Sequence, residues 1–220
     1  MARSYKQLCG VATALDLVGD RWSPLLVRDL LLGPLRFTDL AEGLPGIGTN
    51  TLADRLKHLE MAGVVQRRLL PLPDGGTVYE LTPLGRELEP ILMALGRWGT
   101  KSMGSLPPDV ATRSRWLAAA MVAFHDPGAS LKRAMTWELH LSDGPFTVQG
   151  KGRTLTVTAG APEDADLVLW TDDASWHGLL TGRISPAQAQ ATGALRIEGD
   201  PGGLTQLLGL FAFPGLAAAS

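Results

Sequence analysis

The chain has 220 residues and a mass of 23.4 kDa, with 45% hydrophobic and 19% charged residues, and this length favours two ordinary domains over one large domain. Its 20 Lys and Arg residues against 22 Asp and Glu residues give a net charge of −2, which excludes a general binder of nucleic acid or anionic membranes, so any contact with a polyanion must be local. A single cysteine, Cys9, excludes an intrachain disulfide and a four-cysteine zinc site, and we therefore expect a cytoplasmic protein without a structural metal.

Glycine, proline and capping residues divide the first part of the chain into helices. The predicted helices, in chain order, cover residues 9–18, residues 24–32 with Ser23 as the N-cap, a short stretch from Phe37 that carries Leu40 and Leu44, and a fourth stretch that begins at Thr49 or Asn50. In the fourth helix the spacing of Leu52, Leu56 and Leu59 predicts one buried face. Its other face is polar and turned outward.

The next segment has the pattern of a β-hairpin followed by another helix. Two extended runs at residues 64–70 and 77–81 flank the turn Asp74-Gly75-Gly76. Thr82-Pro83 caps a helix that continues through Trp98 with a kink at Pro90. A short helix, a turn, a helix with a polar outer face and a two-stranded wing together predict a winged helix-turn-helix domain whose fourth helix enters the major groove.

This half of the chain resembles the HxlR family of bacterial winged-helix regulators, a branch of the MarR-like group. The resemblance is carried by Cys9, residues 15–22, 30–33 and 36–40, Leu52, and residues 55–57, 59–60, 63–65 and 79–85. It implies a DNA-binding homodimer in which the first helix and the helix after the wing form the dimer contact. The family often carries an arginine at the wing tip where this sequence has Asp74-Gly75-Gly76, so the implied minor-groove contact lacks its usual residue.

Side-chain chemistry on the fourth helix and the wing indicates the contacts with DNA. Arg55 can reach a guanine edge or a phosphate, Asn50 an adenine edge, and Thr51 a phosphate or a thymine methyl group. Arg67 and Arg68 are neighbours on a strand, so their side chains point to opposite faces and at most one faces DNA easily. The predicted DNA contacts are Thr49, Asn50, Thr51, Arg55, Lys57, His58, Arg67 and Arg68, and the alternative for each residue taken singly is an ordinary solvated side chain.

Cys9, at the start of the first helix, is a candidate redox sensor. The HxlR resemblance includes members that sense oxidants or electrophiles through a cysteine at this place, and a helix N-terminus favours a thiolate. The alternative is a small, buried and inert residue.

Residues 102–109 form the best linker in the chain, because two consecutive prolines and small polar residues disfavour a continuing helix. We therefore predict a DNA-binding and dimerisation domain over residues 1–105, a linker over residues 106–109 and a second domain over residues 110–220. The first 105 residues contain 12 basic and 11 acidic residues and the remainder 8 and 11, so the second half offsets a weakly basic first half. Between residues 47 and 70, four basic side chains against two acidic ones supply local positive charge.

The second half has the pattern of a sheet followed by helices. The predicted elements are a helix at residues 116–124, strands at 136–141, 146–148, 155–157 and 167–170 that form a meander, a helix at 174–180, a helix with a capping box at Ser185, a strand at 195–197, and an amphipathic helix through Leu204, Leu207, Leu208 and Phe211. Trp137, Leu139 and Leu141 alternate with polar residues, which predicts a strand with one wet face.

This order of elements resembles the sterol-carrier-protein fold, on the strength of residues 165–169, 179–189 and 193–200. The expected fold class is therefore α+β: a winged helix-turn-helix domain plus a sterol-carrier-like domain, with an antiparallel-type sheet covered by helices around an apolar cavity. The resemblance implies that this cavity takes lipids, fatty acyl chains or similar molecules. The candidate lining residues are Trp137, Leu139, Phe146, Leu155, Trp170, Trp176, Leu180, Leu207, Leu208 and Phe211. The alternatives are plain core packing for each residue and a filled, ligandless dimerisation module for the domain.

Together these features predict a ligand-responsive transcription regulator, with repression as the expected sign. A homodimer would bind a palindromic double-stranded DNA operator, and an apolar small molecule or lipid in the second domain would change the spacing of its recognition helices. The alternative is a thiol-responsive regulator that acts through Cys9 and has a purely structural second domain.

An enzyme is disfavoured. The sequence has no nucleophile elbow, phosphate loop or dinucleotide fingerprint, and His177 with Asp172 and Asp173 is better interpreted as part of a capped helix than as a catalytic group. We also expect no cofactor and no membrane partner, because Pro214-Gly215 interrupts the uncharged stretch near the end of the chain.

Overall fold

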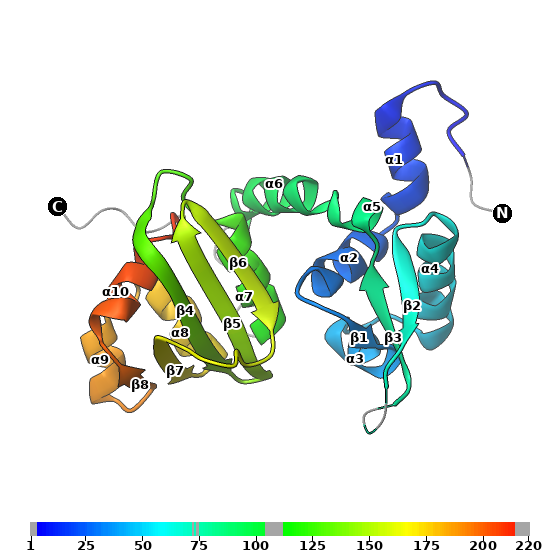
Figure 1. Cartoon of the computed structure of the whole chain (residues 1–220). Helices are drawn as coiled ribbons and strands as arrows, with labels where there is room; N and C mark the ends of the chain where they lie inside the picture. The colour runs from blue at the N-terminus through cyan, green and yellow to red at the C-terminus, as the bar shows by residue number, and fades with distance from the viewer. Residues whose placement is uncertain (1–3, 72, 74, 104–111, 214–220) are drawn as a thin grey trace. The chain divides into compact units, whose positions relative to one another are not determined.

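A computed structural model describes residues 4–71, 73, 75–103 and 112–213 (Figure 1). The chain divides into two compact units, residues 1–92 and 93–220, which we call the N-terminal unit and the C-terminal unit. The division falls inside a helix, and the predicted linker at residues 106–109 lies outside the described residues, so the predicted domain boundaries stay a prediction. None of the helices within the described ranges combines the length and the apolar character that a membrane crossing requires.

The N-terminal unit is a winged helix-turn-helix fold, as predicted. Its helices are α1 (Gly10–Val18), α2 (Ser23–Leu31), α3 (Phe37–Gly43), α4 (Thr49–Met61) and α5 (Pro83–Arg86), its strands are β1 (Leu35–Arg36), β2 (Val65–Leu69) and β3 (Thr77–Leu81), and α6 (Glu89–Thr100) begins in it. The sheet order is β1-β3-β2, with antiparallel pairing throughout. β2 and β3 form the predicted wing.

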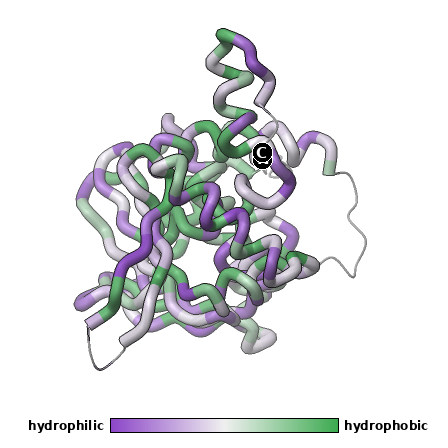
Figure 2. Tube along the Cα trace, turned by 90° about the vertical axis from the view of Figure 1, so that its right-hand side faces the viewer, coloured by the Kyte–Doolittle hydropathy of each residue, from purple (hydrophilic) through white to green (hydrophobic). Residues whose placement is uncertain are grey.

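A single apolar face holds α4 in place. Leu52, Leu56 and Leu59 are each at most 1% exposed, which confirms the predicted buried face. Full burial of a leucine side chain contributes about 1.5–3 kcal/mol relative to an exposed one, so three leucines on one stripe fix the rotation of the helix. The polar residues opposite that stripe are therefore held on the surface. Figure 2 shows the same interleaving of apolar and polar residues along the other helices and strands.

The predicted cap of α2 is wrong. Ser23 is buried and belongs to the helix itself, and its hydroxyl group contacts the Asp20 carboxylate. Asp20 accepts the backbone N–H groups of Trp22 at 2.9 Å and of Ser23 at 3.1 Å. Trp22 stands at the N-cap position, so the carboxylate of Asp20, two residues earlier, binds the N–H groups at the start of the helix, the role expected of the Ser23 hydroxyl.

The helix predicted after the wing is broken into α5 and α6. The N–H groups of Glu87 and Leu88 each bond to a carbonyl three residues earlier, at 3.2 Å, and this tighter turn ends α5. Pro90 then lies in the first turn of α6, where a missing N–H costs nothing, and α5 ends four residues before it, so the kink predicted at Pro90 takes the form of a break between two helices. The predicted cap at Thr82 is confirmed, since its hydroxyl accepts the Gly85 N–H at 3.1 Å.

The C-terminal unit is a five-stranded mixed sheet with helices packed against it (Figure 1). Its helices are α7 (Ser114–Ala123), α8 (Asp173–Leu180), α9 (Pro186–Ala191) and α10 (Gly202–Leu208), and its strands are β4 (Leu131–Leu141), β5 (Gly144–Gly152), β6 (Thr154–Ala159), β7 (Leu167–Thr171) and β8 (Leu195–Gly199). The predicted alternation along β4 is confirmed, because Trp137 and Leu139 are fully buried while Glu138 and His140 are half-buried. Trp137 Nε1 donates to the Gly203 carbonyl at 3.0 Å and so ties α10 to the buried face of the sheet.

Two predictions about this unit are wrong. β4, β5 and β6 form an antiparallel meander, but β7 pairs in parallel with the other side of β4, which gives the order β6-β5-β4-β7-β8. β4 alternates and the first four residues of β7 are all apolar, but neither pattern shows which strands are neighbours, so the crossover could not be located from them. The last helix also ends early: α10 stops at Leu208, and Phe211 lies beyond it, bridged to His125.

Candidate nucleic-acid interface and ligand domain

The first turn of α4 presents a polar surface. Thr49, Asn50 and Thr51 are exposed, as is Lys57 one and a half turns later. The residue before the helix, Gly48, has no side chain to cap it, so this end offers backbone N–H groups as well as side chains. The backbone N–H groups at such a helix end can bind phosphate oxygens, and its side chains can contact base edges.

Two other predicted DNA contacts on α4 are turned toward α1 and α2. The Arg55 guanidinium lies 3.5 Å from the Asp20 carboxylate, and both side chains are about one-third exposed. His58 Nε2 lies 3.1 Å from the Leu17 carbonyl, which can only accept, so Nε2 carries the hydrogen. These two side chains hold α4 against the end of α1, and a DNA contact would compete with that role.

The wing arginines are each paired with an acid. Arg67 Nε lies 2.7 Å from Glu60 and Arg68 Nε lies 2.8 Å from Glu80. The hydrogen bond with Glu60 raises the pKa of Arg67, while hydrogen bonds from Arg68 and then Gln66 lower the pKa of Glu80. Both arginines are exposed, and each donates through one nitrogen of a planar fork that has further N–H groups.

Sequence reasoning missed an arginine at the wing tip. Arg36, which precedes α3, donates from its terminal nitrogen to the Gly75 carbonyl at 2.9 Å. The next residue, Gly76, has a φ of +88°, which favours glycine, and a Cβ there would collide with the Arg36 guanidinium. The wing therefore has an arginine after all, supplied from 39 residues earlier in the chain. No local pattern could have found it, because the contact depends on the pairing of β1 with β3.

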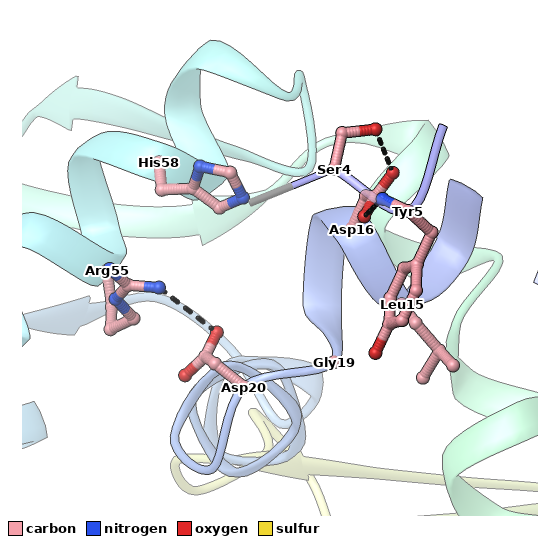
Figure 3. A pocket seen from close by; sticks show the side chains of 8 residues that line it. All are labelled: Ser4, Tyr5, Leu15, Asp16, Gly19, Asp20, Arg55 and His58. Atoms are coloured by element: carbon pink, nitrogen blue, oxygen red, sulfur yellow. Dashed lines mark hydrogen bonds and ion pairs between the residues drawn. The ribbon is translucent and has the colours of Figure 1, made fainter. Parts of the chain in front are cut away.

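A cleft lies beside α4, between the N-terminal segment and α1 (Figure 3). Its volume is about 480 Å³, and its lining residues are Ser4, Tyr5, Leu15, Asp16, Gly19, Asp20, Arg55 and His58. Asp16 accepts the Ser4 hydroxyl at 2.8 Å and the Tyr5 N–H at 3.0 Å, which fastens the N-terminal segment to α1. Burial raises the pKa of Asp20, but hydrogen bonds from Ser23 and Trp22, with the nearby Arg55, more than offset this effect and lower it overall.

Cys9 is exposed and stands immediately before α1, so the buried alternative is wrong. Leu8, Val11 and Leu15 beside it are also exposed. The first helix thus presents an accessible thiol next to an apolar surface.

The predicted ligand-lining residues of the C-terminal unit fall into three groups. Seven of them are buried: Trp137, Leu139, Phe146, Trp176, Leu180, Leu207 and Phe211. Leu155 and Leu208 are half-buried and lie on or face the helices. Trp170 is also half-buried but lies on the other face of the sheet. Trp170 pairs with His140 in the register of β4 and β7, on the face opposite Trp137 and Leu139. There it stacks on His140, with ring centroids 5.2 Å apart, and under the Arg196 guanidinium at 3.8 Å. It is therefore separated from the other nine.

One buried donor in this unit is orphaned. Trp176 is fully buried, and its Nε1 has no hydrogen-bond partner among the described residues. A buried unsatisfied N–H costs about 1–3 kcal/mol, so its presence needs an explanation.

The structure does not assemble His177 with Asp172 and Asp173. Asp172 caps α8 by accepting the Ser175 N–H at 2.8 Å, and Asp173 accepts the Ser114 hydroxyl at 2.7 Å. His177 Nδ1 instead contacts the Arg183 guanidinium. The interpretation of the two aspartates as part of a capped helix is confirmed at Asp172.

The stability of the C-terminal unit should fall as the solution becomes mildly acidic. Burial, and then Arg183, lower the pKa of His177 below its ordinary value of 6.5, and burial lowers that of His125 although Asp126 opposes it. The folded state therefore binds fewer protons than the unfolded state, and the stabilisation, complete above pH 6.5, is lost as the pH falls through the folded-state pKa values. In urea unfolding at pH 7.5 and pH 5, His177→Gln should lose less stability between the two pH values than the unaltered protein does. An equal loss of stability in the two proteins would contradict this assignment.

Comparison with known proteins agrees with this geometry. Residues 17–106 match the family model described as HxlR-like helix-turn-helix. The uncharacterized HTH-type transcriptional regulator YvaP of Bacillus subtilis is 39% identical over 88 residues, which are 40% of this chain and 82% of that protein. The chain belongs to the HxlR family. Further relatives of this HxlR protein are an uncharacterized HTH-type transcriptional regulator of Synechocystis (37% identity, 42% of this chain and 69% of that one) and the HTH-type transcriptional regulator YodB of Bacillus subtilis (36% identity, 39% and 77%).

Each of these relatives matches 39–42% of this HxlR protein. Residues 127–212 match a different family model, the SCP-2 sterol transfer family. The molecule is thus a transcriptional regulator of HxlR type fused to an SCP-2 domain, and both resemblances drawn from the sequence are confirmed.

Proposed function

We propose that this HxlR-family regulator acts as a homodimer that reads a palindromic DNA operator with α4 and responds to an apolar small molecule or lipid in its SCP-2 domain. The observation that carries the DNA-binding part is the first turn of α4, where Thr49, Asn50 and Thr51 are exposed on a helix whose rotation is fixed by buried leucines. In helix-turn-helix proteins the N-terminal residues of this helix contact base edges. Asn50 can pair with an adenine, while Lys57 contributes charge toward a phosphate.

Exposed apolar side chains support the dimer. Val11 on α1 is 69% exposed, and Ile91, Leu95 and Trp98, which lie one turn apart on α6, are 52–66% exposed. Side chains of this kind in helical stripes are typical of surfaces that a partner covers. In a symmetric dimer the two α4 helices would read half-sites about 34 Å apart, one turn of DNA.

Fluorescence anisotropy with the chain's own upstream region tests this proposal. We expect selective binding that weakens steeply as salt rises, because phosphate contacts release counterions. Native mass spectrometry of the same complex should give two protein chains per duplex. Binding that is equal on scrambled DNA, or a single chain per duplex, would overturn the proposal.

The ligand-binding part rests on the SCP-2 match and on Trp176. An apolar molecule that offers a hydrogen-bond acceptor, such as a carbonyl, hydroxyl or carboxyl oxygen, would satisfy the orphaned Nε1. A coupling of about 1–3 kcal/mol between this ligand and DNA is enough to change operator occupancy by one to two orders of magnitude.

Trp176→Phe separates a ligand contact from simple packing. Phenylalanine keeps most of the apolar surface and removes the unsatisfied N–H, so the free protein should be as stable as before, or up to about 1 kcal/mol more stable. Affinity for a fluorescent fatty acid, measured by titration, should fall about tenfold because the acceptor loses its donor. Trp170→Phe, on the other face of the sheet, is the matched control and should leave that affinity unchanged. Unchanged affinity in Trp176→Phe would refute the acceptor contact.

A second candidate, a thiol switch, is favoured by the exposure of Cys9. Alkylation of Cys9 would then change operator affinity in the unaltered protein, and fatty acid would not. The reverse pattern, in which Cys9→Ser retains its response to fatty acid, assigns regulation to the SCP-2 domain.

A further inference from the structure

The cleft beside α4 is not used by the proposed contacts with DNA or with an apolar ligand. We propose that it binds a small organic cation with an apolar body, such as a protonated arylalkylamine, and that this cation competes with Arg55 for Asp20. Its volume of about 480 Å³ lies within the range of small-molecule sites. The effect on DNA rests on the proposed function of α4, while the binding itself does not.

The charge of the lining favours a cation. Among the described lining residues, the carboxylates of Asp16 and Asp20 stand against a single guanidinium, that of Arg55, so these three side chains together carry a net charge of −1. The cleft also lies at the C-terminal end of α1, where the helix dipole is negative and its last carbonyls lack helical partners. A bound anion would meet both carboxylates and this helix end.

The resident ion pair is loose enough to exchange. Arg55 and Asp20 are 3.5 Å apart with both side chains about one-third exposed, whereas charge-assisted hydrogen bonds are normally 2.7–2.9 Å long. Ion pairs with this exposure contribute little to the stability of the folded protein. An ammonium group that binds Asp20 at a normal hydrogen-bond distance can therefore displace Arg55.

An apolar wall sets the other requirement for the ligand. Tyr5 and Leu15 are 57% and 47% exposed, and Figure 3 shows them on one side of the cleft, with Arg55 and His58 on the other. An aromatic ring attracts an ammonium group through its face, and leucine accepts a hydrocarbon body. A neutral apolar molecule could contact this wall but would bring no positive charge to replace Arg55 at Asp20.

Displacement of Arg55 would reach the DNA-binding helix directly. Arg55 is one turn along α4 from Thr51, and its present partner lies in the corner between α1 and α2. Once released, its guanidinium is available to a phosphate or a guanine edge. The expected consequence is a change in operator affinity when the cation binds.

The test compares three molecules of one size on the full-length protein by calorimetry. We expect 2-phenylethylamine to bind with a Kd of about 1 mM, and neutral 2-phenylethanol and anionic 3-phenylpropionate to bind at least about tenfold more weakly. Anion binding as tight as amine binding, or no saturable amine binding, would overturn the proposal. Because no DNA is present, this result does not depend on whether the protein reads an operator.

Two variants locate the site. Asp16→Asn keeps an acceptor for the Tyr5 N–H but removes one charge, and should weaken amine binding about tenfold. Asp54→Asn makes the same charge change on the exposed face of α4 and should leave amine binding unchanged. If Asp16→Asn does not fold, Tyr5→Ala removes the aromatic wall and should also weaken binding. Equal amine affinity in the lining variant and in Asp54→Asn would show that the amine binds elsewhere.

Discussion

Asn50→Ala should weaken binding to the operator by about 2–6 kcal/mol per dimer, because each amide pair with an adenine is worth about 1–3 kcal/mol and the proposed dimer would make two. Asn50 is exposed in the first turn of α4 and has no hydrogen bond within the described structure that folding would lose. The free energy of unfolding should therefore change by less than about 0.5 kcal/mol. Anisotropy on the operator and on a scrambled duplex measures the effect, and the scrambled duplex should respond far less.

Lys57→Ala provides the contrasting case on the same helix. Lys57 is exposed, and its flexible ammonium can reach a phosphate but gives no base discrimination. Loss of Lys57 should weaken binding to the operator and to the scrambled duplex alike. It should also reduce the slope of log affinity against log salt concentration by about 1 per lost phosphate contact. If Asn50→Ala behaved in this uniform way, the assignment of α4 as the base-reading helix would be wrong.

Trp137→Ala should destabilise the C-terminal unit by about 3–5 kcal/mol, the cost of removing a large aromatic side chain from a core. Trp137 is fully buried on β4, and its Nε1 donates to the Gly203 carbonyl at the start of α10. The substitution creates a cavity and also removes the donor to that carbonyl. Urea unfolding followed by far-ultraviolet circular dichroism gives the change without relying on tryptophan fluorescence.

Two further variants divide this loss into its parts. Trp137→Phe keeps most of the buried surface and loses the hydrogen bond, so it should cost about 1–3 kcal/mol. Trp170→Ala removes the same residue type from the neighbouring strand on the opposite, half-exposed face, and should cost less than Trp137→Ala because less apolar surface is lost. A loss for Trp170→Ala as large as that for Trp137→Ala would mean that the two faces of the sheet are equally packed.

Local patterns were sufficient for α4 and β4. The three leucines of α4 repeat with the helical period, and the burial of that stripe followed directly from it. The alternation around Trp137 and Leu139 likewise predicted which face of β4 is buried. In both cases the signal lies within a few neighbouring residues, so no knowledge of the rest of the chain was needed.

Local patterns failed where the outcome depended on which groups folding brought within reach. Ser23 was predicted to cap α2, but the first N–H groups of that helix lie within reach of Asp20 instead. The run at residues 167–170 of β7 is apolar throughout, which is typical of a parallel strand, but it does not show that β4 is the partner.

The sequence by itself determined that this protein has a winged helix-turn-helix unit and a sterol-carrier-like unit, through its two family resemblances. It also determined which face of α4 is buried, because periodicity fixes the apolar face of a helix. Only the tertiary structure decided what each charge does. It paired Arg55 with Asp20, Arg67 with Glu60 and Arg68 with Glu80. It also brought Arg36 to the wing tip. The physical reason is that an ion pair forms between side chains that folding brings within a few ångströms, and the separation of the two residues along the chain carries no record of that distance.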